Sequence, residues 1–204
     1  MKNRFSLYLL CAVFFLGPAF AEGLREDPER QAQAQKALEL RLSYAASADY
    51  DPYSTADSDV LKKARGLYQE QKLQEAIDEA AKGLKKYKYN IDLLILQASA
   101  YRKLEIIDKA DEIRRQWFAL MDSILNSGDG RGFDTAYKVI TIAEEYTTLR
   151  LLGLEVVSQS LVGNKGSAFD VMTVKDAKSG EKFAVYFNID LINKWLDKTF
   201  NAKE

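Results

Sequence analysis

The sequence predicts an α+β protein in which helical hairpins precede a small antiparallel sheet. Residues 58–125 repeat at a spacing of about 34 residues with the pattern of paired helices. A glycine-rich joint follows at 126–132, and beyond it apolar residues alternate with the period of two that is typical of strands. We expect a signal peptide at 1–21, a helical region at 22–130, and a helix-plus-sheet region at 131–204 that packs with it as one unit.

The first residues have the three zones of a secretory signal peptide. Lys2 and Arg4 supply positive charge, and residues 5–16 are apolar but fewer than the roughly 20 needed to span a bilayer. Residues 19–21, Ala-Phe-Ala, fit the pattern that signal peptidase cleaves. We therefore expect cleavage after Ala21, a periplasmic or secreted protein, and no stable membrane anchor after cleavage. The alternative is an uncleaved anchor.

The composition limits the chemistry that is open to the chain. There is no histidine, and the single cysteine, Cys11, lies in the expected signal peptide. Ser-His-Asp and Cys-His nucleophiles and ordinary zinc sites are therefore excluded. Catalysis would rest on carboxylates, Tyr, Lys or Ser, so we lean against an enzyme and expect no cofactor. The net charge of −1 becomes −3 without Lys2 and Arg4, too near neutrality to suggest nucleic acid as a partner.

The helical region is predicted to contain a first helix followed by two helical hairpins. The first helix, at 29–47, places Leu38, Leu42 and Ala45 on one face. Pro52 interrupts the chain after it, and Asp57 or Ser58 could cap the next helix. The hairpin helices are expected at 58–69, 73–86, 91–103 and 107–125.

The hairpins resemble tetratricopeptide repeats. Small and large residues match at equivalent positions of the two copies: Ala64 with Ala98, Leu67 with Tyr101, Leu73 with Ile107, and Ala76 with Ala110. Gln71 and Glu105 stand where the repeat usually has a turn glycine. Two units are also fewer than the roughly three that a free-standing solenoid needs. The alternative is a generic bundle of helical hairpins.

The last part of the chain is predicted as one helix, a three-stranded antiparallel meander and a closing helix. The helix, at 133–151, is apolar on much of its surface, and Gly153 is placed to end it. Residues 154–162, 169–174 and 183–189 are the expected strands. The closing helix, about 190–200, offers its apolar residues to the sheet: Leu191, Ile192, Trp195 and Leu196.

Several short phrases resemble an uncharacterised family of exported bacterial proteins, a domain of unknown function with tetratricopeptide-like helices. The phrases begin at Tyr50 (YDPY), Ser127 (SGDG), Ala136 (AYKVI), Glu144 (EEY), Leu152 (LGL), Asp170 (DVMTV) and Tyr186 (YFNID). The resemblance covers about 40–200. It implies an α+β protein outside the cytoplasm and carries over no activity.

The loop at 127–132 is the first candidate binding site. Its glycines could form an anion-binding nest at the start of the following helix, and its candidate residues are Ser127, Asp129, Arg131 and Tyr137. The alternative is a tight linker between the two halves. The loop is not a phosphate loop, because no Gly-Lys-Ser/Thr follows, and it lacks the acidic spacing of an EF-hand.

Carboxylates form the second set of candidates. Glu144 and Glu145 are about 100° apart on a helix, so they cannot face each other, but one could pair with Asp170 or Asp190 as a hydrolytic dyad. The alternative is that one of the two glutamates faces water and the other accepts hydrogen bonds from neighbouring groups. Asn188 and Asp190 could join Asp129 or Asp170 around calcium, or could cap the last helix.

The helical half is also rich in tyrosine: Tyr50, Tyr53, Tyr68, Tyr87, Tyr89 and Tyr101. These residues could line a concave surface for a peptide or glycan, or could pack between helices. We favour an interaction module whose helices present a groove to an envelope protein or peptide while the sheet braces them. The alternatives are a carboxylate-dependent envelope hydrolase and a calcium-stabilised structural protein. Glu144 or Glu145 lying with another carboxylate in one open pocket would favour the hydrolase.

Overall fold

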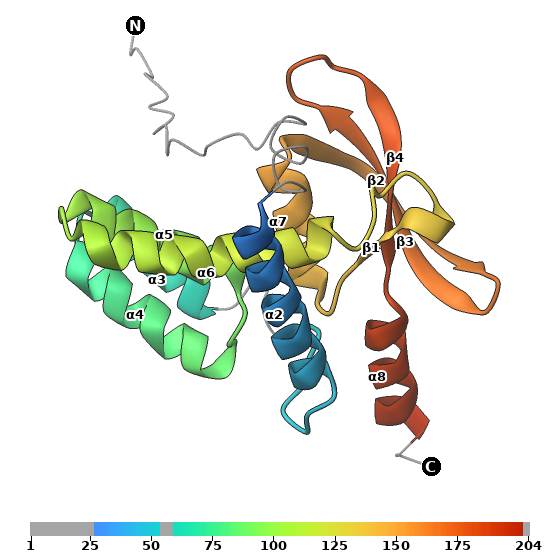
Figure 1. Cartoon of the computed structure of the whole chain (residues 1–204), viewed down its shortest axis with the longest axis horizontal. Helices are drawn as coiled ribbons and strands as arrows, with labels where there is room; N and C mark the ends of the chain where they lie inside the picture. Colours follow the sequence, from blue (N-terminus) through green and yellow to red (C-terminus); the bar gives the residue numbers. More distant parts are fainter. Residues whose placement is uncertain (1–26, 54–58, 202–204) are drawn as a thin grey trace, which may run out of the picture.

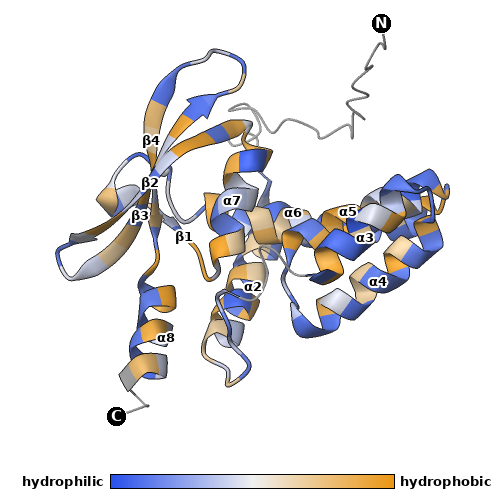
Figure 2. Cartoon of the chain, turned by 180° about the vertical axis from the view of Figure 1, so that it is seen from behind, coloured by the Kyte–Doolittle hydropathy of each residue, from blue (hydrophilic) through white to orange (hydrophobic). Residues whose placement is uncertain are grey.

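A computed structural model describes residues 27–53 and 59–201. The predicted signal peptide and the predicted helix cap at Asp57 or Ser58 lie outside these residues. Figure 1 shows helices α3 to α6 on one side of the molecule and the sheet with α8 on the other, while α2 and α7 lie between them. Figure 2 shows the same arrangement from behind. The protein is α+β, as the sequence predicts.

The helical half consists of α2 (Pro28–Ala45), α3 (Asp59–Gln69), α4 (Leu73–Lys86), α5 (Ile91–Lys103) and α6 (Ile107–Leu125). Helices α4, α5 and α6 begin and end where the periodicity predicts. The predicted face of the first helix is wrong, since α2 buries Ala34, Ala37 and Arg41 while Leu42 is 46% exposed. The small residues let α2 approach α6 closely, which places Arg41 inside the protein.

The two hairpins turn in the same way at equivalent positions of the repeat. Gln71 and Glu105 have φ of 61° and 60°, the left-handed conformation for which the missing glycine would be favoured. The amide of Lys72 donates to the carbonyl of Leu67 at 2.9 Å, and that of Ile106 donates to Tyr101 at 3.0 Å. The repeat is therefore present in the backbone, while membership of the tetratricopeptide class stays a resemblance.

The second half contains a short 3-10 helix, η1 (Phe133–Thr135), strand β1 (Tyr137–Lys138) and helix α7 (Ile142–Leu151). The predicted single helix at 133–151 is therefore wrong in its first part. Ala136 is extended, with φ −62° and ψ 143°, and the hydroxyl of Thr141 accepts a hydrogen bond from Glu144 N and so starts the helix later. Gly153, at φ 75°, follows its last turn as predicted.

The sheet has four strands in the order β1-β4-β3-β2, with β2 (Leu154–Asn164), β3 (Ser167–Asp176) and β4 (Lys182–Asn188). The last three form the predicted antiparallel meander. The predicted purely antiparallel, three-stranded sheet is wrong, because β1 pairs with β4 in parallel and makes the sheet mixed. The closing helix α8 (Asp190–Asn201) is where the sequence predicts it.

One hydrophobic core joins the two halves. It contains Leu94 of α5, Met121 of α6, Leu149 of α7 and Met172 and Phe187 of the sheet. A second cluster lies between α3, α4 and α5. Among the residues described, none of the helices combines the length and apolar character needed to cross a membrane.

Candidate functional site

Helix α7 carries two consecutive buried glutamates that face different partners. Glu144 is directed toward α2, whereas Glu145 lies near Asp170 of β3. Because neighbouring residues on a helix are about 100° apart, the two carboxyl groups cannot act on one bond, as the sequence predicts. Each glutamate therefore defines a separate polar centre.

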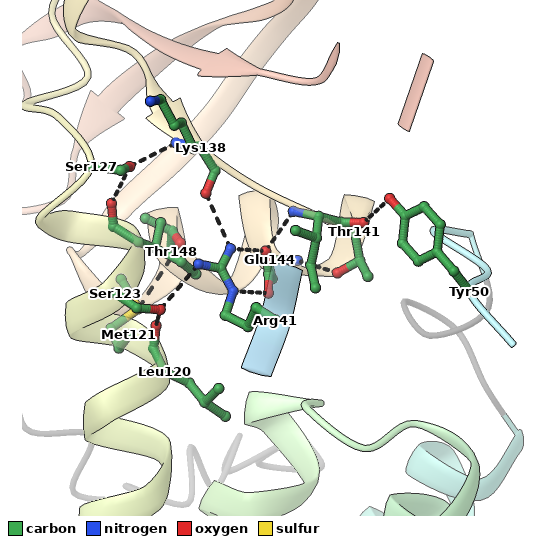
Figure 3. A network of polar contacts seen from close by, with 12 residues as sticks. Arg41, Tyr50, Leu120, Met121, Ser123, Ser127, Lys138, Thr141, Glu144 and Thr148 are labelled. Atoms are coloured by element: carbon green, nitrogen blue, oxygen red, sulfur yellow. Dashed lines mark hydrogen bonds and ion pairs between the residues drawn. The ribbon is translucent and has the colours of Figure 1, made fainter. Parts of the chain in front are cut away.

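The Glu144 centre is a satisfied ion pair (Figure 3). Arg41 donates from Nε and Nη2 to the two carboxylate oxygens at 2.9 and 2.6 Å. The guanidinium also donates to Ser123 Oγ at 3.0 Å and to the Lys138 carbonyl at 3.1 Å, and the amide of Ile140 donates to Glu144. Bidentate geometry of this kind is strong and directional. It fastens α2 to α6, β1 and α7, which is a structural role.

The Glu145 centre has no such partner. Glu145 is fully buried, and neither carboxyl oxygen has a hydrogen-bond partner among the described residues. Burial, followed by the nearby charge of Asp170, raises the pKa of Glu145 to about 9. Asp170 is 5% exposed, and burial raises its pKa as well. Glu145 is therefore protonated at neutral pH.

A chain of side chains leads from this pair to the surface of β2. The Gln159 amide nitrogen donates to Asp170 Oδ2 at 2.7 Å, and the Tyr146 hydroxyl donates to Gln159 Oε1 at 2.8 Å. Tyr146 is 43% exposed. Tyr53, in the loop after α2, lies beside α7, because the amide of Ile142 donates to the carbonyl of the preceding Pro52 at 3.1 Å. The Tyr53 ring packs against Trp195 of α8 with centroids 5.9 Å apart.

Comparison with known proteins places the chain in a family. The domain of unknown function DUF4919 matches residues 31–198, which is most of the chain. The chain belongs to the DUF4919 family. No curated protein matches it, and no solved structure matches it. Both glutamates, Asp170 and Gln159 lie inside the DUF4919 segment.

The predicted dyad partners are only partly brought together in this DUF4919 chain. Glu145 lies with Asp170, but the pair is buried and does not face an open pocket. Asp190 instead accepts hydrogen bonds from Ala168 N at 2.8 Å and from Asn188 Nδ2 at 3.0 Å. Asn188 in turn accepts a bond from the first amide of α8. Asn188 thus bonds to the start of α8, as a capping residue does, whereas the Asp190 carboxylate joins α8 to β3.

The glycine loop uses its amide groups internally. The amides of Asp129 and Gly130 both donate to the Thr135 carbonyl, at 3.0 and 2.8 Å. The Asp129 carboxylate accepts from the Thr135 hydroxyl and from Arg131 N, and these bonds lower its pKa. Ser127 Oγ accepts from Lys138 N at 2.8 Å. This geometry favours the linker over the anion-binding nest.

The remaining candidates are the tyrosines and the proposed calcium ligands. Tyr137 lies beneath Gly130 and packs against Phe187, with ring centroids 5.8 Å apart. Tyr50 and Tyr87 are buried, and the hollow beside Tyr44, Tyr87 and Tyr89 has a volume of about 20 Å³. Within 27–53 and 59–201, no three Asp, Glu, His or Cys side chains gather as metal ligands.

Sequence reasoning misses two residues that matter to these centres. Arg41 continues the spacing of Ala34 and Ala37 on the buried face of α2, but nothing in the sequence identifies a partner 103 residues away. Gln159 is one polar residue within a predicted strand. Only the pairing of β2 with β3, which sets Gln159 opposite Met172 and one diagonal step from Asp170, brings it to the carboxylate.

Proposed function

We propose that this protein is an exported binding module that pairs an extended segment of an envelope protein with the free edge of β2. The observation that carries the proposal is the exposure of this strand. Leu154–Asn164 has 11 residues, stands at the end of the sheet order and pairs with β3 alone among the described strands. Every residue from Glu155 to Leu161 is exposed. An open edge with unpaired backbone groups is a template for another strand.

The side chains of β2 also suit a partner strand. Val156, Val157 and Leu161 are 39, 50 and 70% exposed, and Glu155 is the only charged residue in this exposed stretch. Edge strands that avoid pairing usually carry several charges or a proline, and burial of apolar surface stabilises association by about 25 cal/mol per Å². The register shift between Val156 and Ser158 leaves the rest of β2 regularly paired with β3.

The binding surface then lies on the sheet, and the helices brace it, whereas from the sequence we expect a groove on the helices and a bracing sheet. The apolar side chains of β2 are exposed along one strand, while the tyrosines Tyr50, Tyr68 and Tyr87 of the helical half are buried. The shared core lets the helices brace the sheet. For the hydrolase alternative, the reacting bond would have to lie between both carboxyl groups, and Glu145 is 0% exposed. The geometry therefore favours binding over hydrolysis.

Export rests on residues 1–21 of the sequence. Their charge, apolar stretch and Ala-Phe-Ala end are the support for the proposed location, and hence for an envelope partner. A protein recovered from the periplasmic fraction should begin at Glu22 when its N-terminus is read by mass spectrometry. A chain that still begins at Met1 in the cytosolic fraction would reject the export part of the proposal.

The binding part can be tested by selecting peptides from a random displayed library on the purified protein. We expect enriched peptides with alternating apolar residues. Val157→Lys and Leu161→Lys should each weaken their binding about tenfold, which corresponds to about 1.4 kcal/mol. Ile107→Lys, at a 47% exposed apolar site on α6, is the matched control and should leave binding unchanged. Equal affinity for all variants would reject the β2 edge as the binding surface.

A further inference from the structure

The buried carboxylates differ in whether they have a cation. Three of them have a carboxylate oxygen close to a cationic nitrogen. The distances are 3.0 Å from Glu79 Oε2 to Lys63 Nζ, 2.6 Å from Asp122 Oδ2 to Arg30 Nε, and 2.6 Å from Glu144 Oε2 to Arg41 Nη2. Glu145 and Asp170 are also buried, yet no Lys or Arg nitrogen among the described residues lies within 4.0 Å of either. Buried carboxylates are normally paired, because leaving water costs free energy that a partner must offset. Glu145 avoids this cost by keeping its proton, so the Asp170 carboxylate is the buried charge that lacks a cation in the described part of the chain.

The pair lies next to the proposed binding strand. Asp170 stands opposite Leu161 in the register of β2 and β3, and both point to the face of the sheet that carries Met172. The side-chain amide of Gln159, itself an exposed residue of β2, donates to Asp170. The Asp170 carboxylate is therefore held from the β2 side by a residue of the exposed strand.

Aromatic rings border the same position. Tyr146 and Tyr53 are 43 and 48% exposed. The Tyr146 hydroxyl is linked to Asp170 through Gln159, and Tyr53 follows Pro52, whose carbonyl accepts a hydrogen bond from Ile142 N of α7 at 3.1 Å. Trp195 packs on Tyr53 and extends the aromatic surface. Aromatic faces attract ammonium and guanidinium groups, and together with carboxylates they form the usual recognition site for organic cations.

We propose that the Asp170 carboxylate, bordered by Tyr53 and Tyr146, is a subsite for the cationic group of a lysine or arginine in the segment that binds β2. The inference rests on the proposed function. A strand added to β2 lies about 4.8 Å beyond it, so only a long side chain can pass over Leu161 and reach Asp170. The cation takes the place of the Gln159 amide on the Asp170 carboxylate, and its aliphatic stem covers Leu161.

The test uses blocked peptides of about nine residues, alternating valine and threonine, with lysine, norleucine or glutamate at the centre. N-acetyl-lysine amide serves as the probe of a free cation. Binding to the intact protein is measured by calorimetry at neutral pH. We expect the lysine peptide to bind about tenfold more tightly than the norleucine peptide, and the glutamate peptide to bind most weakly.

Asp170→Asn and Tyr146→Leu should each reduce this preference for lysine to about twofold or less. Glu155→Gln removes an exposed carboxylate from the same strand and should leave the preference intact, which separates the subsite from general charge attraction. Tyr146 is exposed, so its variant tests the subsite even if Asp170→Asn lowers stability.

The outcomes separate the two proposals. Equal binding of the lysine and norleucine peptides would overturn the cation subsite and leave strand pairing in place. Binding of N-acetyl-lysine amide that Asp170→Asn abolishes, with no binding of any peptide, would support the subsite and reject strand pairing. No binding of any probe would reject both.

Discussion

Two adjacent residues on α7 show how surroundings decide what a carboxyl group does. Glu144 accepts hydrogen bonds from the Arg41 guanidinium and the Ile140 amide, so its oxygens lie in a satisfied network. Glu145, one position later, lies beside another acid, has no cation among residues 27–53 and 59–201 to offset its burial, and keeps its proton. The unpartnered acid makes the stability of the protein depend on pH.

Replacing Glu145 by Gln should remove most of that dependence. The folded pKa of Glu145 is raised to about 9 from its ordinary 4.5, chiefly by burial. The stabilisation from its proton is fully present below pH 4.5 and is lost as the pH rises to 9, at about 1.4 kcal/mol per pH unit. We expect urea denaturation between these limits to show this fall in the wild type and a flatter profile in Glu145→Gln. Glu155→Gln is the control and should keep the wild-type slope, whereas parallel profiles for Glu145→Gln and the wild type would contradict the assignment.

At the scale of elements, the glycine joint shows which glycines the backbone requires. A Cβ on Gly128 would lie 2.1 Å from the Thr135 carbonyl oxygen. Gly130 has φ of 69°, and a Cβ there would lie 2.4 Å from the ring of Tyr137. Gly132 is extended, at φ −169°, with no atom within 4 Å of its Cβ position. The three neighbouring glycines are thus not equivalent.

Alanine at each position should separate them. Gly128→Ala and Gly130→Ala should each lower the free energy of unfolding by about 2–4 kcal/mol, since one forces backbone apart and the other adds strain at positive φ. Gly132→Ala should change it by less than about 0.5 kcal/mol. Thermal and urea denaturation of the three variants would measure how much free energy of unfolding each one loses. Equal losses at all three sites would show that the joint is rebuilt on substitution.

The elements also show what sequence patterns can and cannot predict. The helices of 58–125 are predictable because helix pairs satisfy their backbone locally and the repeat marks their buried faces twice. Strand β4 is equally clear from the alternation of Phe183, Val185 and Phe187. The apolar spacing of residues 136–140 fits a helix, so the sequence predicts a helix there, and this prediction is wrong. The extended form of this segment depends on pairing with β4, far along the chain, which no local pattern records.

The candidate site divides in the same way. Glu145 and Asp170 are predictable as a possible pair because both are acidic residues in apolar surroundings. Their burial and the lack of a neighbouring cation follow from packing alone. Arg41 is missed because Leu38 and Leu42 suggest a different buried face of α2. In the structure the face with the small residues packs on α6, and Arg41 reaches α7 from it.

For the whole molecule, the shared core predicts one unfolding transition. Trp117 lies on α6 in the helical half and Trp195 on α8 beside the sheet, so each can report on its own half. Trp195→Phe leaves the first as the only tryptophan, and Trp117→Phe leaves the second. We expect the fluorescence midpoint of each variant in urea to match the midpoint of its own circular dichroism, because residues of both halves share one cluster. A sheet signal that is lost before the helical signal would show two independent units.

The position of Arg41 has a consequence for the order in which the chain assembles. During synthesis Arg41 precedes Ser123 by 82 residues and its ion-pair partner Glu144 by 103. Helix α2 is therefore made before α6, on which it packs, and before α7, which carries the partner of Arg41. Local hairpins can close early, while the N-terminal helix waits for the far end of the chain. Under the proposed export, this ion pair can form only after residue 144 has crossed the membrane.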